Sequence, residues 1–236
     1  MKRRVQRELL ATLPPDDPCA VRSRRDLRRV NGWMRHHAIM AGALKNDLNG
    51  LAPEQITELG AGDGTFLLRV AQKIRAGQAS SLPVSTEVNA TVLDLQKIVS
   101  AETLAGFRNL GWRAEAVVSD VFDWPQTSGP AGVVIANLFL HHFEDAQLAE
   151  LLRFVSGRAR LFIAIEPRRA PWPLFCSRLL WAMGCNDVTR HDAVASVRAG
   201  FSGHELFALW PEKQNWRVTE QRAGAFSHLF IARETI

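Results

Sequence analysis

Residues 56–66 read Ile-Thr-Glu-Leu-Gly-Ala-Gly-Asp-Gly-Thr-Phe, and this stretch decides how the rest of the chain is interpreted. A short apolar run enters three alternating glycines, and a helical pattern of apolar residues begins at Phe66. Glycines at such a turn allow a tight bend and let a ligand approach the backbone without a clash against Cβ. The helix that follows offers free N–H groups at its start, which suit a carboxylate or a phosphate. The stretch therefore predicts a ligand-binding loop between a strand and a helix.

The rest of the chain repeats the order of a short apolar run and a longer amphipathic stretch. Five runs are typical of strands in a parallel sheet with helices on both faces: Ile56–Leu59, Ala90–Leu95, Arg113–Val118, Gly132–Asn137 and Ala159–Ile165. Two further runs, separated by a tight turn, predict a closing antiparallel pair: Trp216–Gln221 and Ala225–Ala232. We therefore expect an α/β fold with a doubly wound, mostly parallel, seven-stranded sheet whose last strand is antiparallel.

The composition is that of a globular protein. Of the 236 residues, 47% are hydrophobic and 22% are charged, which suits one domain with a sizeable core and excludes a disordered or low-complexity chain. The longest apolar run, residues 131–140, is about half the length of a membrane-spanning helix. The N-terminus lacks the continuous apolar stretch of a secretory signal. Three cysteines without a C-x-x-C pair argue against a disulfide scaffold and a thiolate zinc site, so we expect a cytoplasmic location.

Positive charge is concentrated at the N-terminus. Residues 1–35 hold ten basic and four acidic side chains, a net charge of +6, in a chain whose net charge is +5. Around a break at Pro14–Pro18 we expect a short first helix and then one helix whose apolar stripe runs from Leu27 to Leu44. We interpret residues 1–50 as a basic helical cap on residues 51–236. Arginines opposite an apolar stripe are typical of a solvated face, although such a cap also suits nucleic acid, anionic lipid or an acidic partner.

The spacing of residues 58–64 separates two kinds of nucleotide-binding loop. The dinucleotide fingerprint G-x-G-x-x-G requires glycine where this chain has Thr65. The pattern E-x-G-x-G-x-G instead resembles motif I of the class I S-adenosylmethionine-dependent methyltransferases of small-molecule type. The resemblance covers about residues 55–166 through motifs and extends to the C-terminus through the closing strand pair. It implies a Rossmann-like fold, S-adenosylmethionine as cofactor and S-adenosyl-L-homocysteine as product.

The resemblance also implies which residues contact the cofactor. Asp94, at the end of the second strand, would accept hydrogen bonds from the ribose, and Asp120, after the third, would accept one from the adenine amino group. The fourth strand would end beside the sulfonium. The expected cofactor-binding residues are Glu58, Gly60, Ala61, Gly62, Gly64, Asp94, Leu95, Asp120, Val121, Phe122, Asn137 and Leu138. Each acid alone is more often a helix cap or a surface residue. The interpretation therefore depends on all of these residues standing at the positions that the family expects.

Polar residues after the fourth and fifth strands are candidates for the acceptor side of the site. Either His141 or His142 has the ordinary pKa needed to deprotonate a hydroxyl; we favour His142, and the alternative is that one of them caps the next helix. Glu166 would orient the acceptor or pair with an arginine. Residues 170–212 are expected to form an acceptor-binding insertion, or lid. There His191 is a second candidate base, oriented by a carboxylate, unless the segment is a solvated helix start.

These observations favour an enzyme that transfers a methyl group to oxygen or activated carbon of a small, apolar or aromatic acceptor by in-line displacement. The main alternative is an RNA or DNA methyltransferase that uses the basic N-terminal helices. Against it, residues 137–140 read Asn-Leu-Phe-Leu and lack the Pro-Pro-aromatic motif of enzymes that methylate exocyclic amines of bases. Two further alternatives are a non-catalytic S-adenosylmethionine-binding module and an amphipathic N-terminal helix on a membrane surface. No metal-ligand spacing is evident, so no metal is expected, and the oligomeric state stays open.

Overall fold

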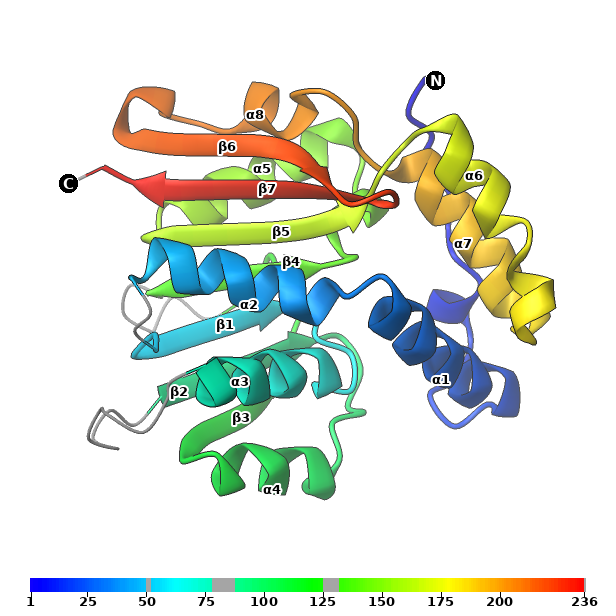
Figure 1. Ribbon diagram of the computed structural model, residues 1–236, viewed down its shortest axis with the longest axis horizontal. Helices are drawn as coiled ribbons and strands as arrows, with labels where there is room; N and C mark the ends of the chain where they lie inside the picture. The colour runs from blue at the N-terminus through cyan, green and yellow to red at the C-terminus, as the bar shows by residue number, and fades with distance from the viewer. Residues whose placement is uncertain (50–51, 78–87, 125–131, 236) are drawn as a thin grey trace.

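A seven-stranded sheet forms the centre of the molecule. The computed structural model describes residues 1–49, 52–77, 88–124 and 132–235. The strand order is β3-β2-β1-β4-β5-β7-β6, in which β7 is antiparallel to β5 and β6 and the other neighbours are parallel (Figure 1). The order reverses between β1 and β4, which makes this the switch point of a doubly wound sheet. The predicted mostly parallel sheet with an antiparallel end is confirmed.

The elements alternate along the chain much as the sequence predicts. The strands are β1 (Gln55–Leu59), β2 (Val88–Asp94), β3 (Trp112–Val118), β4 (Val133–Asn137), β5 (Leu161–Pro167), β6 (Trp216–Ala223) and β7 (Ser227–Glu234). The α-helices are α1 (Pro18–Trp33), α2 (His36–Asp47), α3 (Thr65–Gly77), α4 (Ala101–Asn109), α5 (Asp145–Ser156), α6 (Pro171–Ser177), α7 (Asp187–Ala199) and α8 (Glu205–Leu209). Short 3₁₀ helices are η1 (Leu10–Thr12), η2 (Leu140–His142), η3 (Leu180–Met183) and η4 (Lys213–Asn215).

Two layers of helices cover the sheet. α2, α3 and α4 lie in front of it in the view of Figure 1, and α5 and α8 lie behind. The front core includes Met40 and Leu44 of α2, and the rear core includes Leu151 of α5 and Trp210 after α8. Every residue of β4 and β5 is buried, as expected for parallel strands that are covered on both faces. Helices packed on both faces of the sheet hold the central strands, and with them the carboxyl ends of those strands, in place.

Three helices gather beyond one end of the sheet. β1, β4 and β5 point toward the right of Figure 1, and α1, α6 and α7 lie past their carboxyl ends. Helix α1 is joined to α7 by buried polar contacts: the carboxylate of Asp26 accepts the N–H of Asn186 at 2.9 Å, and the Ser23 and Thr189 hydroxyls lie 2.8 Å apart. Ligands of open α/β sheets bind at this end, so these helices surround the place where a site is expected.

The first residues of the chain differ from the prediction. No α-helix precedes Pro14; residues 1–8 have no regular secondary structure, and only η1 follows before that proline. The backbone N–H of Arg4 donates to the carbonyl of Arg198 at 3.1 Å, and those of Leu9 and Leu10 donate to the carboxylate of Asp192 at 2.8 and 2.9 Å. We call residues 1–10 the strap. Because the strap's hydrogen bonds go to α7, the amphipathic helix that the membrane-surface alternative requires is not formed.

The apolar stripe from Leu27 to Leu44 forms two helices, not the single helix that its periodicity predicts. α1 ends at Trp33 and α2 begins at His36, because Arg35 adopts a left-handed conformation with φ of 59°. A non-glycine residue in this conformation is unfavourable. The turn places the His36 side chain in a fully buried polar contact, described below, that a continuous helix would not make.

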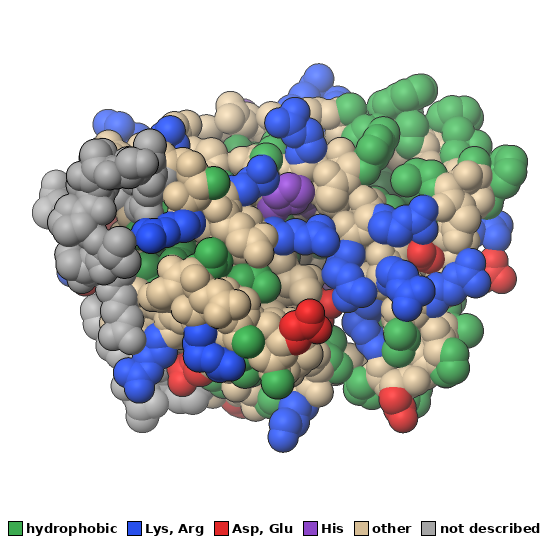
Figure 2. Space-filling model, turned by 60° about the horizontal axis from the view of Figure 1, so that its bottom comes forward, with side chains coloured by type: hydrophobic (Ala, Val, Ile, Leu, Met, Phe, Trp, Pro, Cys, Tyr) green, Lys and Arg blue, Asp and Glu red, His purple; other side chains and the backbone are tan. Residues whose placement is uncertain are grey.

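The surface is strongly basic on the face shown in Figure 2, where Lys and Arg side chains spread across most of the view. Hydrophobic side chains gather at the end of the molecule that α1, α6 and α7 form. Trp172 and Phe175 of α6 and Trp181 of η3 are all exposed. Within the described part of the chain, no helix combines the length and the apolar character that a membrane crossing requires.

Candidate active site

The loop between β1 and α3 is built on three left-handed glycines. Gly60, Gly62 and Gly64 have φ of 64°, 57° and 72°, values that disfavour a side chain. A Cβ on Gly60 would lie 2.1 Å from the Phe139 ring, whereas a Cβ on Gly62 would meet nothing within 4 Å. The N–H of Ala61 is held by the carbonyl of Leu93 at 2.9 Å. The loop is therefore fixed to β2 on one side. Beside the Cα of Gly62, next to the start of α3, there is space that a ligand could fill.

Glu58 is a buried carboxyl group at the end of β1, just before this loop. The residue is 2% exposed and accepts the N–H of Leu67. Its Oε2 has no hydrogen-bond partner among the described residues. Burial raises its pKa well above the ordinary value, and the nearby charges of Asp63 and Asp94 add to the rise. An unpaired buried acceptor costs about 1–3 kcal/mol, so this oxygen suits a ligand that brings a hydrogen-bond donor.

Two acids stand at the ends of the next strands. Asp94 closes β2, and its carboxylate accepts the N–H groups of Gly62 and Gln96, both at 2.8 Å. Asp120 follows β3, is exposed and accepts the N–H of Phe122 at 3.0 Å. Because β3, β2 and β1 are adjacent and parallel, these acids and the glycine loop share one edge of the sheet. Asp94 is thus already hydrogen-bonded to the open part of the loop.

Apolar residues accompany the two acids. Leu95 is 69% exposed directly after Asp94, while Val121 is buried and Phe122 is half-buried. The Phe122 ring meets Phe143 edge to face at 5.7 Å between centroids. These side chains give the edge near β2 and β3 an apolar lining beside its carboxylates.

Asn137 and Leu138 end β4 under the cap. The Oδ1 of Asn137 lies 2.8 Å from His36 Nδ1, and the hydroxyl of Ser227 lies 2.6 Å from His36 Nε2. An amide oxygen only accepts, so Nδ1 donates to Asn137 and Nε2 accepts from Ser227. Burial lowers the pKa of His36 to about 4, although the bond to Asn137 opposes the shift, and the imidazole is neutral. Leu138 follows with φ of 55°, a strained value that often marks a functional site.

Glu166 holds the turn that follows β4. It is fully buried and accepts the N–H groups of Phe139, Leu140 and His141 at 3.0, 2.8 and 3.3 Å, and it lies 2.7 Å from His141 Nδ1. No arginine pairs with Glu166 within the described ranges, so the arginine pair left open by the sequence is not formed. Both carboxylate oxygens are engaged away from solvent. Glu166 therefore holds His141 and the turn that carries it, and its orienting of an acceptor stays a prediction.

The other ring nitrogen of His141 faces the strap. His141 Nε2 lies 3.3 Å from Glu8 Oε1, and His142 Nε2 lies 3.9 Å from Glu8 Oε2. The two imidazole rings are 4.3 Å apart between centroids, and Ser196 of α7 donates its hydroxyl to Glu8. We call Glu8, His141 and His142 the histidine cluster. The strap thus brings a carboxylate to the two histidines that the sequence singled out.

The charges within the cluster are coupled. Burial opposes a charge on His141, but hydrogen bonds and attraction from Glu166 and Glu8 raise its pKa to about 9. Burial would likewise raise the pKa of Glu8, but the contact with His141 lowers it to about 2. Burial lowers the pKa of His142, and the charge of His141 lowers it further. At neutral pH the cluster therefore holds an imidazolium between two carboxylates and, beside it, a neutral imidazole.

His191 occupies an exposed position on α7. Its Nδ1 lies 2.9 Å from Asp192 Oδ1, and 52% of its side chain is exposed. The sequence expected a carboxylate to orient this histidine, and Asp192 is in that place. The same carboxylate holds the strap, so α7 contributes Asp192 and Ser196 to the surroundings of the histidine cluster.

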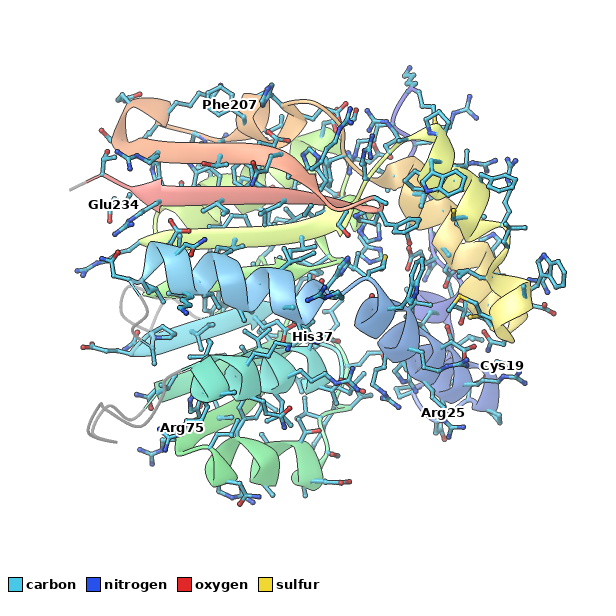
Figure 3. The ribbon with its side chains drawn as sticks, viewed as in Figure 1. Cys19, Arg25, His37, Arg75, Phe207 and Glu234 are labelled. Carbon is cyan, nitrogen blue, oxygen red and sulfur yellow. The ribbon has the colours of Figure 1, made fainter. Side chains whose placement is uncertain are left out.

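An arginine of the cap forms an ion pair with the glycine loop. Arg28 of α1 pairs with Asp63, whose other oxygen accepts the N–H of Thr65 at 3.1 Å at the start of α3. His37, labelled in Figure 3, lies near the start of α2 beside α3; burial and the charge of Lys73 lower its pKa. Arg25 is exposed and points away from the sheet in the same view. Part of the basic charge of the cap therefore contacts the body of the protein.

Comparison with known proteins gives similarity of structure only. No protein-family model matches the chain, and no curated protein does. The solved structure of the plantazolicin methyltransferase BpumL with SAH has a TM-score of 0.66 at 12% identity and covers 93% of this chain and 92% of its own. The mitomycin 7-O-methyltransferase MmcR has a TM-score of 0.62 at 19% identity, covering 96% of this chain and 60% of its own. The magnesium protoporphyrin IX methyltransferase of Synechocystis PCC 6803 has a TM-score of 0.54 at 12% identity, covering 86% and 84%.

The chain has the class I methyltransferase fold. Within this fold, the residues that the sequence marks for a cofactor lie at the carboxyl ends of β1 to β4. Sequence analysis did not single out Glu8 or the contacts of Arg28 and His36. The local pattern gave no signal for Glu8 or for the contacts of His36, since their partners lie more than 100 positions away.

Proposed function

We propose that this protein is an S-adenosylmethionine-dependent methyltransferase acting on oxygen or activated carbon of a small, apolar or aromatic organic acceptor. The observation that carries the proposal is the unpaired Oε2 of buried Glu58, which directly precedes the open backbone of the glycine loop. A buried carboxyl group in that place suits the ammonium group of an amino-acid ligand, whose positive charge would favour the ionised form of Glu58, and the helix start beyond suits the ligand's own carboxylate. A nicotinamide dinucleotide offers neither group at its pyrophosphate.

The cofactor would be held by residues from four adjacent strands. Glu58 and the loop Gly60, Ala61, Gly62 and Gly64 would hold its amino-acid part. Asp94 and Leu95 would contact the ribose, and Asp120 with Val121 and Phe122 would enclose the adenine. Asn137 and Leu138 would border the sulfur. When bound, S-adenosylmethionine supplies a methyl group made electrophilic by a sulfonium, so the chain's remaining task is to orient an acceptor and exclude water.

The histidine cluster is the best-placed acceptor-side group. About a third of the His142 side chain is exposed, at 34%, whereas His141 is 3% exposed and engaged on both nitrogens. We therefore propose that His142 takes the proton of an acceptor hydroxyl, while Glu166 and His141 fix the turn that carries it. His191 is the second candidate base, since it is exposed on α7 beside Asp192.

The helices beyond the sheet would shape the acceptor site. Residues 170–212 comprise α6, η3, α7 and α8, and with the cap of residues 1–50 they surround the carboxyl ends of the strands. BpumL and MmcR, which have similar folds, are described as methyltransferases of plantazolicin and mitomycin. Both names denote small or peptide-like molecules, which supports a small-molecule acceptor for this chain.

A nucleic-acid acceptor is the second candidate, favoured by the Lys and Arg side chains seen in Figure 2. The proposal is tested with S-adenosylmethionine labelled in its methyl group, offered with a panel of phenols and aliphatic alcohols and separately with RNA and DNA. We expect label in a small hydroxyl compound and none in nucleic acid. Label in RNA or DNA alone would favour the second candidate, and label in no compound would leave a binding module.

The role of His142 is tested with the acceptor found in that panel. Replacing His142 by alanine should lower turnover about 10²- to 10⁴-fold, the usual contribution of a general base, with unchanged affinity for S-adenosylhomocysteine. His204→Ala, which removes an exposed histidine next to α8, is the matched control and should leave both quantities unchanged. Full turnover by His142→Ala would exclude it as the base and point to His191 or to proximity alone.

A further inference from the structure

We propose that the histidine cluster is a binding site for one divalent transition-metal ion such as Zn²⁺. Its ligands are Nε2 of His141, Nε2 of His142 and a carboxylate oxygen of Glu8. One ligand atom from each of the three residues lies within 4.8 Å of the other two. The site goes beyond the proposed methyl transfer and does not depend on it.

One ligand pair already has the spacing of a tetrahedral site, and the third ligand lies within reach. Bonds of about 2.0–2.1 Å around zinc separate neighbouring ligand atoms by roughly 3.3–3.5 Å. His141 Nε2 and Glu8 Oε1 are already 3.3 Å apart, and His142 Nε2 lies 3.9 Å from Glu8 Oε2. These two contacts involve different oxygens of Glu8, so binding of one ion would require a rotation of the Glu8 carboxylate or of the partly exposed His142 ring.

The groups around the ligands also fit a metal site. A metal-bound histidine usually donates its second ring N–H to a carboxylate, which fixes the tautomer and makes the free nitrogen a better ligand. Buried Glu166 makes that contact with His141 Nδ1 at 2.7 Å, and its other bonds hold the turn that carries both histidines. Ser196 of α7 donates its hydroxyl to Glu8 and so helps to hold the third ligand in place.

Two carboxylates favour a cation at the cluster. Glu8 and Glu166 contact opposite nitrogens of the His141 imidazole, so a bound ion would take the place of the proton between His141 Nε2 and Glu8 and would face the charge of both carboxylates. Two imidazoles and one carboxylate are a donor set that suits zinc, cobalt, nickel or copper better than magnesium or calcium. Three protein ligands leave at least one coordination position for water or for an oxygen or sulfur atom of a bound molecule. A metal ion and a proton exclude each other on Nε2 of either histidine, so the base role proposed for His142 belongs to the metal-free protein.

The site was not expected from the sequence, because no local motif reveals it. His141 and His142 are neighbours, but Glu8 is 133 positions from His141 and reaches it only because the strap binds to α7. The strap therefore supplies the ligand that turns a pair of histidines into a three-ligand site.

The experiment is a titration of the full, untagged chain with Co²⁺ and with Zn²⁺, without methyl donor or acceptor. We expect one equivalent of Co²⁺ with the visible absorption of a four- or five-coordinate ion, and its displacement by Zn²⁺. Glu8→Gln and His142→Ala should each weaken binding at least about 10-fold, and Glu166→Gln about 10- to 100-fold. His204→Ala is the control and should bind like the wild type.

Two results would overturn the proposal. The first is the absence of stoichiometric binding to wild-type protein. The second is binding of equal strength in Glu8→Gln and His142→Ala, with thermal unfolding showing that both are folded. Neither outcome concerns the methyl donor, whose affinity is measured separately, so failure of the metal site and failure of the proposed function are distinguishable.

Discussion

At the scale of single residues, the glycine loop and its acids could be identified from the sequence, because they are local to strand ends. Glu58, Asp94 and Asp120 stand where the spacing places them, and the three glycines have left-handed conformations. The partners of those residues could not be identified. The bond from Gly62 N–H to Asp94 joins positions 32 apart, and nothing in either local pattern indicates it.

Asp94 provides the sharpest test at this scale. Asp94→Ala should weaken S-adenosylhomocysteine binding about 10- to 100-fold, because it would remove the roughly two hydrogen bonds that we propose to ribose hydroxyls and would free the N–H of Gly62. Calorimetry measures the affinity, and Asp123→Ala, which changes an exposed acid after β3, is the control. Wild-type affinity in a folded Asp94→Ala protein would mean that the ribose lies elsewhere.

At the scale of elements, strands and most helices follow from periodicity, while the cap does not. The stripe from Leu27 to Leu44 predicts one helix, yet the chain turns at Arg35. Contacts with residues distant in the sequence stabilise this turn: His36 bonds to Asn137 and Ser227, and α1 packs on α7 through Asp26. The strap forms no α-helix for the same reason, since α7 accepts the N–H groups of Arg4, Leu9 and Leu10. Tertiary partners decide both segments, and a local pattern carries no information about them.

The lowered pKa of His36 predicts how the stability of the protein depends on pH. Its folded pKa of about 4 lies below the ordinary 6.5, so the unfolded chain binds more protons between these values and stability falls as pH drops from 6.5 toward 4. At pH 5 this loss amounts to about 2 kcal/mol. Urea unfolding at pH 7.5 and pH 5 measures it, and His36→Gln should lose correspondingly less than the wild type. Equal losses in both proteins would contradict a neutral, buried His36.

At the scale of the whole molecule, net charge is a poor guide to partners. The chain carries +5, yet Arg3, Arg28 and Arg29 pair with Asp145, Asp63 and Asp26. Arg3 joins the strap to α5 and Arg28 joins α1 to the glycine loop, so part of the positive charge is already paired within the protein. We expect the exposed remainder to attract RNA only weakly and without sequence preference.

The behaviour toward RNA follows from this distribution. We expect an unstructured RNA oligonucleotide to bind at about 50 mM salt and to dissociate by about 200 mM, because only counterion release drives the association. Fluorescence anisotropy across a salt series measures this. Tight binding that persists at the higher salt would contradict a small-molecule acceptor site and favour a nucleic-acid enzyme.

The central claim is that the edge formed by β1 to β4 binds a sulfonium nucleoside carrying an amino acid. Calorimetric titration of the wild-type chain with S-adenosylhomocysteine tests it most directly, with NAD⁺ as the competing ligand. The account predicts one-to-one binding of S-adenosylhomocysteine and no heat from NAD⁺. An absence of binding by S-adenosylhomocysteine, or saturation by NAD⁺ in its place, would contradict it.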